Sequence, residues 1–354
     1  RGCSYVLFSC VGARMKETAI CLALLLLLTS LIGCIGEQED EVVDLPPEEI
    51  RLNHLMMKGT HNSYHEKTPG VSTIVPENNY THANLSIQAD RLGVRQFELD
   101  VHFIPGMGLR VYHTNLDPGS NCLGFAGCMQ VLLDWSNANQ HHAPLWIFVE
   151  PKDEPLLVEE LGILDMIQNE INQTWPAEQQ ITPADVQGNA VDLRTSVTTT
   201  GWPTLEDSRG KVIFVLLDKT EIRDYYVSQH PTLQNQSMFA IVEENHSLAS
   251  IISFVNPETH GDRLRNVSEA GFMVRTRPDV ATVEAQEVNY TRFDLAMLTG
   301  ANFITTDFPG SDLEVEYAIW LPQGPVMCNP QTAPSHCTTR TLEPWGNYTP
   351  ISIG

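Results

Sequence analysis

The sequence predicts an α/β protein with a TIM-type (β/α)8 barrel. Short apolar segments of strand length recur along the chain, and most are followed by a segment with helical spacing of apolar residues. Polar residues gather where the apolar segments end, as they do around the active sites of such barrels. The alternative is a doubly wound open sheet, which usually carries a glycine-rich phosphate turn after its first strand. No such turn follows the first apolar segment, so we favour the barrel.

Eight segments are the predicted barrel strands. They span 54–60, 94–103, 109–113, 145–150, 211–218, 239–244, 271–276 and 302–307. Apolar residues recur at helical intervals between them, for example over 156–171 and 284–300. We therefore place one barrel over residues 51–310.

The N-terminal segment is expected to direct export rather than to join the fold. An apolar run follows Lys16 and ends in Leu31-Ile32-Gly33-Cys34, which matches a bacterial lipobox, so residues 1–33 are expected to be an upstream extension and signal peptide. Cys34 would then carry the lipid, and the acidic residues 34–50 would form a tether. A plain signal peptide or a single membrane anchor is the alternative. The expected location is the outer face of a prokaryotic cell membrane, or the medium if the protein is secreted.

The charge balance excludes one class of partner. The chain has 21 Lys and Arg residues against 44 Asp and Glu residues, a formal net charge of −23. A nucleic acid would be repelled by such a surface. We predict no nucleic-acid partner and no protein partner.

Four cysteines remain for the folded protein after Cys34, an even number in an exported chain. The simplest of the three possible pairings joins neighbours in the sequence, Cys122 to Cys128 and Cys328 to Cys337. Four free thiols are the alternative. The second bridge would staple residues 311–354, a short C-terminal extension.

Polar side chains end most of the predicted strands, where a barrel builds its active site. They are His61 and Asn62 after the first strand, Glu98 and Asp100 on the second, His113 on the third, Glu150 and Lys152 on the fourth, Arg275 and Arg277 on the seventh, and Asp307 on the eighth. Residues two apart in a strand share a face, so each pair can point into the barrel. One shared polar site is cheaper than several buried ionisable residues that must find partners independently.

The residue types indicate a metal-assisted acid–base reaction. Oxygen donors suit Ca²⁺ or Mg²⁺ rather than zinc, and Ca²⁺ tolerates an irregular shell better. The candidate ligands are the side chains of Asn62, Glu98, Asp100 and Glu150. His61 and His113 could act as general base and general acid, because imidazole titrates near neutrality. This combination fits the cleavage of a phosphodiester.

Several segments resemble a known enzyme family in the right order. KGTHNSYH (58–65), VRQFELDVHF (94–103), VYHT (111–114) and IFVEPKD (147–153) resemble the X-region of phosphatidylinositol-specific phospholipases C. GFMVRTRPDVATVEA (271–285) and DLAMLTGANFITTDFP (294–309) resemble the calcium-dependent bacterial branch of that superfamily. The resemblance covers roughly residues 51–310, and its fold is also a TIM-type barrel.

The resemblance implies roles for individual residues. His61 and His113 match the two catalytic histidines, and the four oxygen donors named above match the calcium ligands. The inositol 2-hydroxyl would attack phosphorus, with His61 or a ligand carboxylate as the base, and His113 would protonate the departing diacylglycerol oxygen. Lys152, Arg275 and Arg277 would grip the phosphate or headgroup, or would form salt bridges with neighbouring carboxylates. The substrate would be a phosphoinositide-like lipid or a soluble phosphodiester.

Two other functions stay open at this point. A glycerophosphodiester phosphodiesterase shares the barrel, the metal and two histidines, but its first histidine usually lies in a His-Arg-Gly setting. Here the setting is His61-Asn62-Ser63, which speaks against that family. A non-catalytic surface barrel that binds only the metal is the third interpretation, and the presence of both histidines beside a full ligand set disfavours it.

Overall fold

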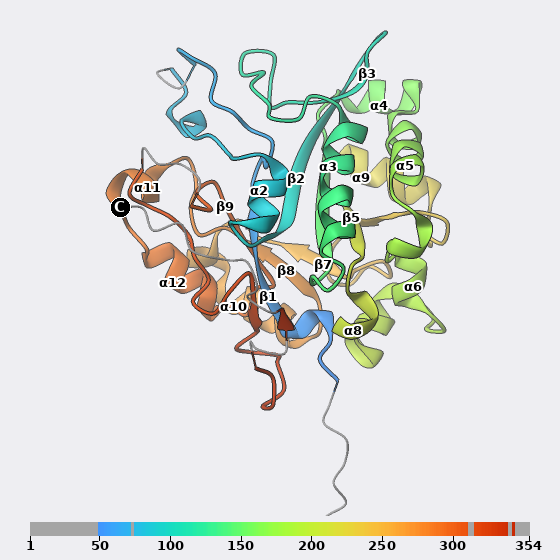
Figure 1. Ribbon diagram of the computed structural model, residues 1–354. Coiled ribbons are helices and arrows are strands. Elements are labelled where there is room, and N and C mark those ends of the chain that lie inside the picture. The colour runs from blue at the N-terminus through green and yellow to red at the C-terminus, as the bar shows by residue number, and fades with distance from the viewer. Residues whose placement is uncertain (1–48, 72–73, 311–314, 339–341, 344–354) are drawn as a thin grey trace, which may run out of the picture. The chain divides into compact units, whose positions relative to one another are not determined.

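Eight parallel strands form a nearly closed barrel in the computed structural model, which describes residues 49–71, 74–310, 315–338 and 342–343 (Figure 1). The strands are β1 (Leu55–Thr60), β2 (Val94–Ile104), β4 (Leu145–Pro151), β5 (Val212–Leu216), β6 (Met238–Ala240), β7 (Ile251–Ser253), β8 (Met273–Thr276) and β9 (Phe303–Thr306). They follow one another in the order β6-β5-β4-β2-β1-β9-β8-β7. The end strands β6 and β7 meet through a parallel bridge between Ile241 and Ile251. The predicted barrel is confirmed. The predicted signal peptide, the predicted lipidation site Cys34 and most of the predicted tether lie outside the described residues.

One of the eight segments predicted as barrel strands, residues 109–113, forms a strand that is not part of the barrel. β3 (Gly108–Val111) runs antiparallel to β2 and forms a hairpin with it outside the barrel order. β7 takes the missing place in the barrel, and the sequence interpretation overlooked it because three residues are too few to show a period. His113 therefore lies beyond a hairpin strand and not at the end of a barrel strand.

Helices alternate with most of the barrel strands and are short. They are α2 (Leu85–Asp90), α3 (Phe125–Ala138), α4 (Pro155–Leu161), α5 (Ile163–Thr174), α6 (Pro183–Gln187), α7 (Leu193–Thr195), α8 (Leu205–Ser208), α9 (Glu221–Gln229), α10 (Pro257–Glu269), α11 (Val283–Glu287) and α12 (Thr291–Leu298). The segment predicted over 156–171 divides into α4 and α5 at Gly162, whose φ of 64° lies in the left-handed region that ends a helix. The segment over 284–300 likewise divides into α11 and α12.

Aromatic side chains fill the barrel toward the amino-terminal ends of its strands, and polar groups occupy the carboxyl-terminal end. The Trp146 ring on β4 lies 4.8 Å from the Phe303 ring on β9, between centroids. Phe148 packs 5.4 Å from the same Phe303, and the Arg275 guanidinium lies 5.8 Å from the Phe148 ring. Apolar side chains therefore fill the barrel interior up to Phe148, and charged side chains such as Arg275 begin next to it, toward the carboxyl ends of the strands.

The chain after β9 is fastened to the outside of β1. β10 (Val326–Cys328) pairs antiparallel with β1, and Cys328 is bonded to Cys337 as predicted. The buried Lys58 ammonium donates to the carbonyls of Pro309 and Ile319, at 3.0 and 3.2 Å, and lies over the Trp320 ring. These contacts place the C-terminal segment against the first strand. The domain boundary drawn at residue 310 stays a prediction.

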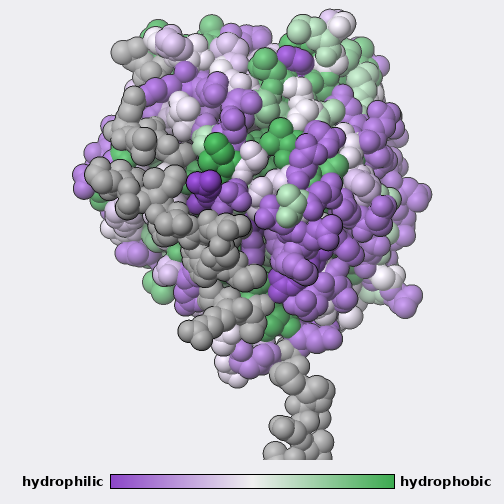
Figure 2. Space-filling view, viewed as in Figure 1, coloured by the Kyte–Doolittle hydropathy of each residue, from purple (hydrophilic) through white to green (hydrophobic). Residues whose placement is uncertain are grey.

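The surface is mostly hydrophilic on the face shown in Figure 2, as the composition requires. Among the described residues no helix combines the length and the apolar content needed to cross a membrane.

Candidate active site and metal centre

A cavity of about 320 Å³ opens at the carboxyl ends of the barrel strands. Side chains from β1, β2, β4, β5, β7 and β8, or from the loops that follow them, line it: His61, Glu98, Glu150, Leu217, Asp218, Lys219, Thr220, Ser253, Val255, Arg275 and Arg277. Five of the ten residues predicted for catalysis, metal ligation, substrate binding or a strand-end role at this face therefore share one cavity, although their strands are far apart in the sequence.

Three carboxylates meet at the edge of this cavity. Glu98 and Asp100 on β2 and Glu150 on β4 each offer an oxygen within 4.8 Å of the others. β2 and β4 pair with Asp100 opposite Glu150, which is why the two strands bring these side chains together. Burial, and next the Glu150 charge, raise the pKa of Asp100 well above its ordinary value. Burial also opposes ionisation of Glu98, but Arg275, His61 and other positive neighbours outweigh it and lower its pKa.

The donor set fits a hard divalent cation. Carboxylate oxygens are the ligands that Ca²⁺ and Mg²⁺ prefer, and a divalent cation would offset the repulsion among three carboxylates in so small a space. The Oδ1 atom of Asp100 is buried and has no hydrogen-bond partner among the described residues. Burying such an oxygen is costly unless a ligand satisfies it.

Asn62, the fourth predicted ligand, lies beside this cluster. The backbone N–H of Ser63 donates to the Glu98 carbonyl at 2.9 Å, and the Ser63 hydroxyl accepts from the Glu98 N–H at 2.8 Å. Asn62 is buried and adopts a φ of 43°, a left-handed conformation that asparagine tolerates better than most residues. The turn after β1 is thus fastened to β2 at the residue that begins the carboxylate pair.

His61 is held by a carboxylate that the sequence interpretation did not assign to it. Its Nδ1 lies 2.7 Å from Oδ1 of Asp307, and its Nε2 lies 3.6 Å from Oε1 of Glu98. Asp307 follows β9, the barrel neighbour of β1, and also accepts from Arg277 at 2.5 Å. Burial raises the pKa of Asp307, but Arg277 and His61 outweigh burial and hold it well below the ordinary value. An ionised Asp307 keeps the proton on Nδ1 and leaves the Nε2 lone pair of His61 toward the cavity.

Asp279 holds the chain around Asp307 by two hydrogen bonds. Its Oδ1 accepts the backbone N–H of Asp307 at 2.9 Å, and its Oδ2 accepts the Thr306 hydroxyl. Burial and the neighbouring charge of Asp307 raise the pKa of Asp279 to about 7. Nothing in the spacing of the sequence pointed to Asp279; an acidic residue soon after a predicted strand was the one available signal.

His113 belongs to a second cluster outside the lining of the cavity. Its Nδ1 lies 3.8 Å from Oδ2 of Asp117, and that same oxygen lies 2.8 Å from Nε2 of His65. Burial, and next the positive charges of Lys152 and His61, lower the pKa of His113 to about 4. His113 is therefore close enough for the charges of Lys152 and His61 to affect its pKa, but it lies beyond the β2–β3 hairpin and not at the end of a barrel strand. His65 is buried in this cluster.

The predicted substrate-binding cations are all engaged by carboxylates. Arg275 donates to Glu98 at 2.5 Å and Arg277 to Asp307 at the same distance. The Lys152 ammonium lies 2.8 Å from Glu150 and 3.1 Å from Asp100. Arg275 and Arg277 also line the cavity, whereas Lys152 is not among the residues that line it. The salt-bridge alternative is thus realised for all three, and substrate contact stays a prediction.

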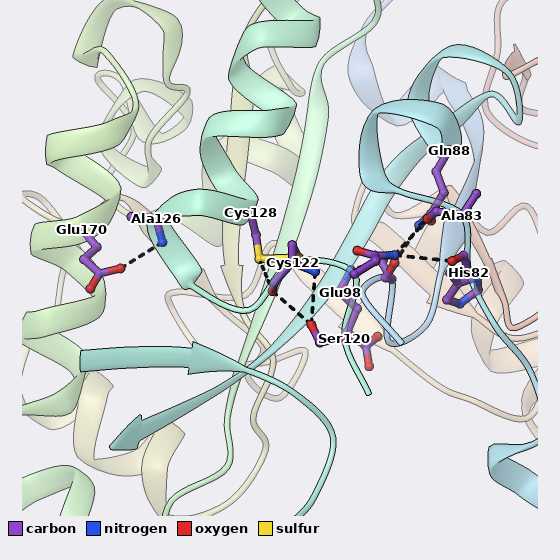
Figure 3. The surroundings of a disulfide bond; sticks show 11 residues. His82, Ala83, Gln88, Glu98, Ser120, Cys122, Ala126, Cys128 and Glu170 are labelled. Atoms are coloured by element: carbon purple, nitrogen blue, oxygen red, sulfur yellow. Dashed lines mark hydrogen bonds between the residues drawn. A yellow bond between two sulfur atoms is a disulfide. The ribbon is translucent and has the colours of Figure 1, made fainter. Parts of the chain in front are cut away.

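The disulfide predicted between Cys122 and Cys128 lies beside the site. Cys122 and Cys128 are bonded, with Cα atoms 5.3 Å apart, and this bridge joins the loop after His113 to the start of α3 (Figure 3). In the same loop Asn121 donates from its side chain to the Ala83 carbonyl at 3.0 Å. The bridge therefore limits the movement of the loop that carries Asp117.

A family profile described as calcium-dependent phosphoinositide phospholipase C matches residues 50–109 and 104–330. This match covers most of the chain and all of the site. The chain belongs to the calcium-dependent phosphoinositide phospholipase C family.

Solved structures agree at the level of the fold. The calcium-dependent phosphatidylinositol-specific phospholipase C of Streptomyces antibioticus is 18% identical, with a TM-score of 0.54 over 73% of this chain and 95% of that one. The calcium-dependent phosphoinositol-specific phospholipase C of a Gram-negative Pseudomonas species, in its apo form, is 16% identical, with a TM-score of 0.53 over 79% of this chain and 95% of that one. A search of curated proteins finds no match.

As a member of this calcium-dependent phosphoinositide phospholipase C family, the chain is a phosphoric diester hydrolase. The predicted resemblance is confirmed. The acidic cluster of Glu98, Asp100 and Glu150 is the group of described residues that could hold the family's metal ion.

Proposed function

We propose that this chain cleaves phosphatidylinositol-like lipids into diacylglycerol and a cyclic inositol phosphate by acid–base catalysis with His61 and His113. The observation that carries the proposal is the cavity in which His61, oriented by Asp307, stands beside three clustered carboxylates. Acid–base residues and an oxygen-ligand cluster at one hollow are what transfer of a phosphoryl group between two hydroxyls requires.

His61 takes the proton of the attacking hydroxyl. Its Nδ1–H is held by Asp307, so the free Nε2 faces the cavity and can accept the proton from the inositol 2-hydroxyl as that oxygen attacks phosphorus. Asp307 stabilises the imidazolium that results, and Arg277 keeps Asp307 ionised. Arg275 and Arg277, which line the same cavity, supply positive charge toward the phosphate.

His113 returns a proton to the departing diacylglycerol oxygen. In the structure its pKa is about 4, because burial and the Lys152 charge disfavour the imidazolium. An anionic phosphate close to the ring favours the charged form and would raise this pKa on substrate binding. The negative charge of Asp117, whose Oδ2 lies 3.8 Å from Nδ1 of His113, also favours the charged form of the ring.

Glu98, Asp100, Glu150 and Asn62 would hold the calcium ion. Bound there, the ion supplies Lewis acidity that stabilises charge on the phosphoryl oxygens and lowers the pKa of the attacking hydroxyl. Mg²⁺ is the alternative ion for the same oxygen donors.

The test compares substrates with and without calcium chelator. Release of cyclic inositol phosphate from phosphatidylinositol vesicles is followed by phosphorus NMR, beside hydrolysis of glycerophosphodiesters. We expect the inositol lipid to be cleaved and the chelator to abolish cleavage. Preference for glycerophosphodiesters, or activity that chelation leaves intact, contradicts the proposal. A His113→Ala variant should lose cleavage and keep Ca²⁺ binding.

We also propose that the enzyme is exported and held at the outer face of its membrane through a lipid on Cys34. The lipobox that ends at Cys34 supports this, and the two disulfides suit an oxidising compartment. A Cys34→Ala variant, expressed in a bacterial host, should move from the membrane fraction to the soluble periplasmic fraction. Unchanged fractionation would refute the anchor.

A further inference from the structure

Lys152 holds two of the three carboxylates of the proposed calcium site. It follows β4, and its backbone N–H donates to the Val101 carbonyl at 2.9 Å, which fixes where the side chain begins. Its ammonium lies 2.8 Å from Oε1 of Glu150 and 3.1 Å from Oδ2 of Asp100. An ammonium so placed makes the contacts that a cation shared by these two carboxylates would make.

The third carboxylate has a cation of a different kind. Glu98 is paired with Arg275, whose guanidinium also donates to the Thr305 hydroxyl and lies beside the Phe148 ring. A planar guanidinium in such a packed setting has little freedom to move, whereas a lysine has a flexible stem. The Lys152 side chain is 25% exposed against 5% for Arg275. Lys152 is thus the cation of the cluster that can leave.

We propose that Lys152 and the calcium ion compete for Asp100 and Glu150, so that binding of the ion displaces the Lys152 ammonium. This inference rests on the metal site of the proposed function. The two cations repel each other and need the same oxygens, which all lie within 4.8 Å of one another. Lys152 therefore weakens calcium binding and in return neutralises the carboxylates when calcium is scarce.

Competition of this kind is a reciprocal coupling between two ligands of one site. Such couplings typically change affinity by about 5–150-fold. Removal of the Lys152 charge should therefore tighten calcium binding, whereas a residue that only supports the site would weaken binding when removed. The two readings predict opposite signs.

The experiment measures Ca²⁺ affinity by isothermal titration calorimetry on the full folded chain, without substrate. We expect Lys152→Met and Lys152→Gln to lower the Ca²⁺ Kd by at least about fivefold. Lys152→Arg keeps a competing cation and should stay close to wild type. The matched control is Lys219→Met: Lys219 lines the same cavity, but its ammonium donates to the Ser253 carbonyl. Loss of that charge should change the Kd by less than about twofold, because solvent and salt screen it.

A second measurement follows thermal unfolding in chelator and in excess Ca²⁺. Both neutral variants should melt lower than wild type in chelator, because Asp100 and Glu150 lose their counter-ion, and should gain more on addition of Ca²⁺. An unchanged or higher Kd in Lys152→Met and Lys152→Gln would overturn the proposal. An equal effect in Lys219→Met would also overturn it, since it would show only a general charge effect.

The outcomes separate this inference from the proposed function. Tighter binding in the Lys152 variants together with failure to cleave inositol lipids would refute the function and leave the competition standing. Cleavage that depends on calcium, with no tightening in these variants, would do the reverse. A wild-type protein that binds no Ca²⁺ in the calorimeter would refute the metal site and the competition together.

Discussion

Substitution of Asp307 by asparagine tests how the site sets the direction of proton transfer. Asp307 stands between two donors, Nδ1–H of His61 at 2.7 Å and the Arg277 guanidinium at 2.5 Å. An asparagine amide cannot accept from both. If its oxygen faces Arg277, its NH₂ faces His61 and forces the proton onto Nε2, so the ring can no longer act as a base.

The magnitude follows from these contacts. A hydrogen bond to a charged group contributes about 1.5–3 kcal/mol, which alone corresponds to a loss of about 10–150-fold in kcat/KM. Loss of the correct tautomer in an Asp–His pair extends the loss toward about 10⁴-fold. Arg277 retains Asp279 at 3.8 Å, so the free energy of unfolding should fall by only about 1–3 kcal/mol. The variant should therefore stay folded at assay temperature.

The assay is steady-state cleavage of phosphatidylinositol in saturating Ca²⁺, with circular dichroism as the control for folding. A double-mutant cycle adds His61→Ala alone and combined with Asp307→Asn. If Asp307 acts through His61, the double variant should lose no more than His61→Ala alone. A folded Asp307→Asn enzyme that keeps a third of wild-type kcat/KM, or losses that add in the double variant, would refute the reasoning.

Three further predictions concern protons and the disulfide near the site. Because the pKa of His113 is about 4 before the substrate binds, the alkaline limb of kcat/KM should lie at lower pH than that of kcat, and identical limbs would count against His113 as the acid. Burial also lowers the pKa of His82 and of His142 to about 4, below the ordinary 6.5, so the unfolded chain binds more protons between these values. The free energy of unfolding should therefore fall by about 1–2 kcal/mol for each as the pH drops from 7 to 5, and urea unfolding of His82→Gln should show a smaller drop than wild type. Replacement of both Cys122 and Cys128 by serine should lower the free energy of unfolding by about 2 kcal/mol and reduce kcat; unaltered kcat would show that the bridge does not restrain the loop beside His113.

The sequence predicted which of these side chains lie together where local order along one strand carries the information. Glu98 and Asp100 lie two apart in a strand, so they must share a face, and the structure places both toward the barrel interior beside Glu150. His61 follows the first strand, where a barrel opens its cavity, and it does line that cavity. Both disulfides could also be predicted, because cysteines separated by only 6 and 9 positions lie close together in the folded chain.

The partners of these residues were decided by tertiary structure. Asp307 reaches His61 across 246 positions because β9 closes the barrel against β1, and no local pattern records which strands become neighbours. Asp117 lies near His113 because the chain forms a hairpin there. The second strand of this hairpin was predicted as a barrel strand, since a strand of four residues has the same pattern in a hairpin as in a barrel.

The sequence by itself therefore determined which chemical groups the protein contains and which of them share one face of a strand or helix. Alternation along a strand and apolar spacing along a helix are local, and a chain carries them wherever it folds. Only the closed barrel decided that Asp307 orients His61 and that Lys152 reaches Asp100, because those contacts join strands that are remote in sequence. The proposed direction of proton transfer and the proposed calcium site both rest on such contacts, so they depend on the fold.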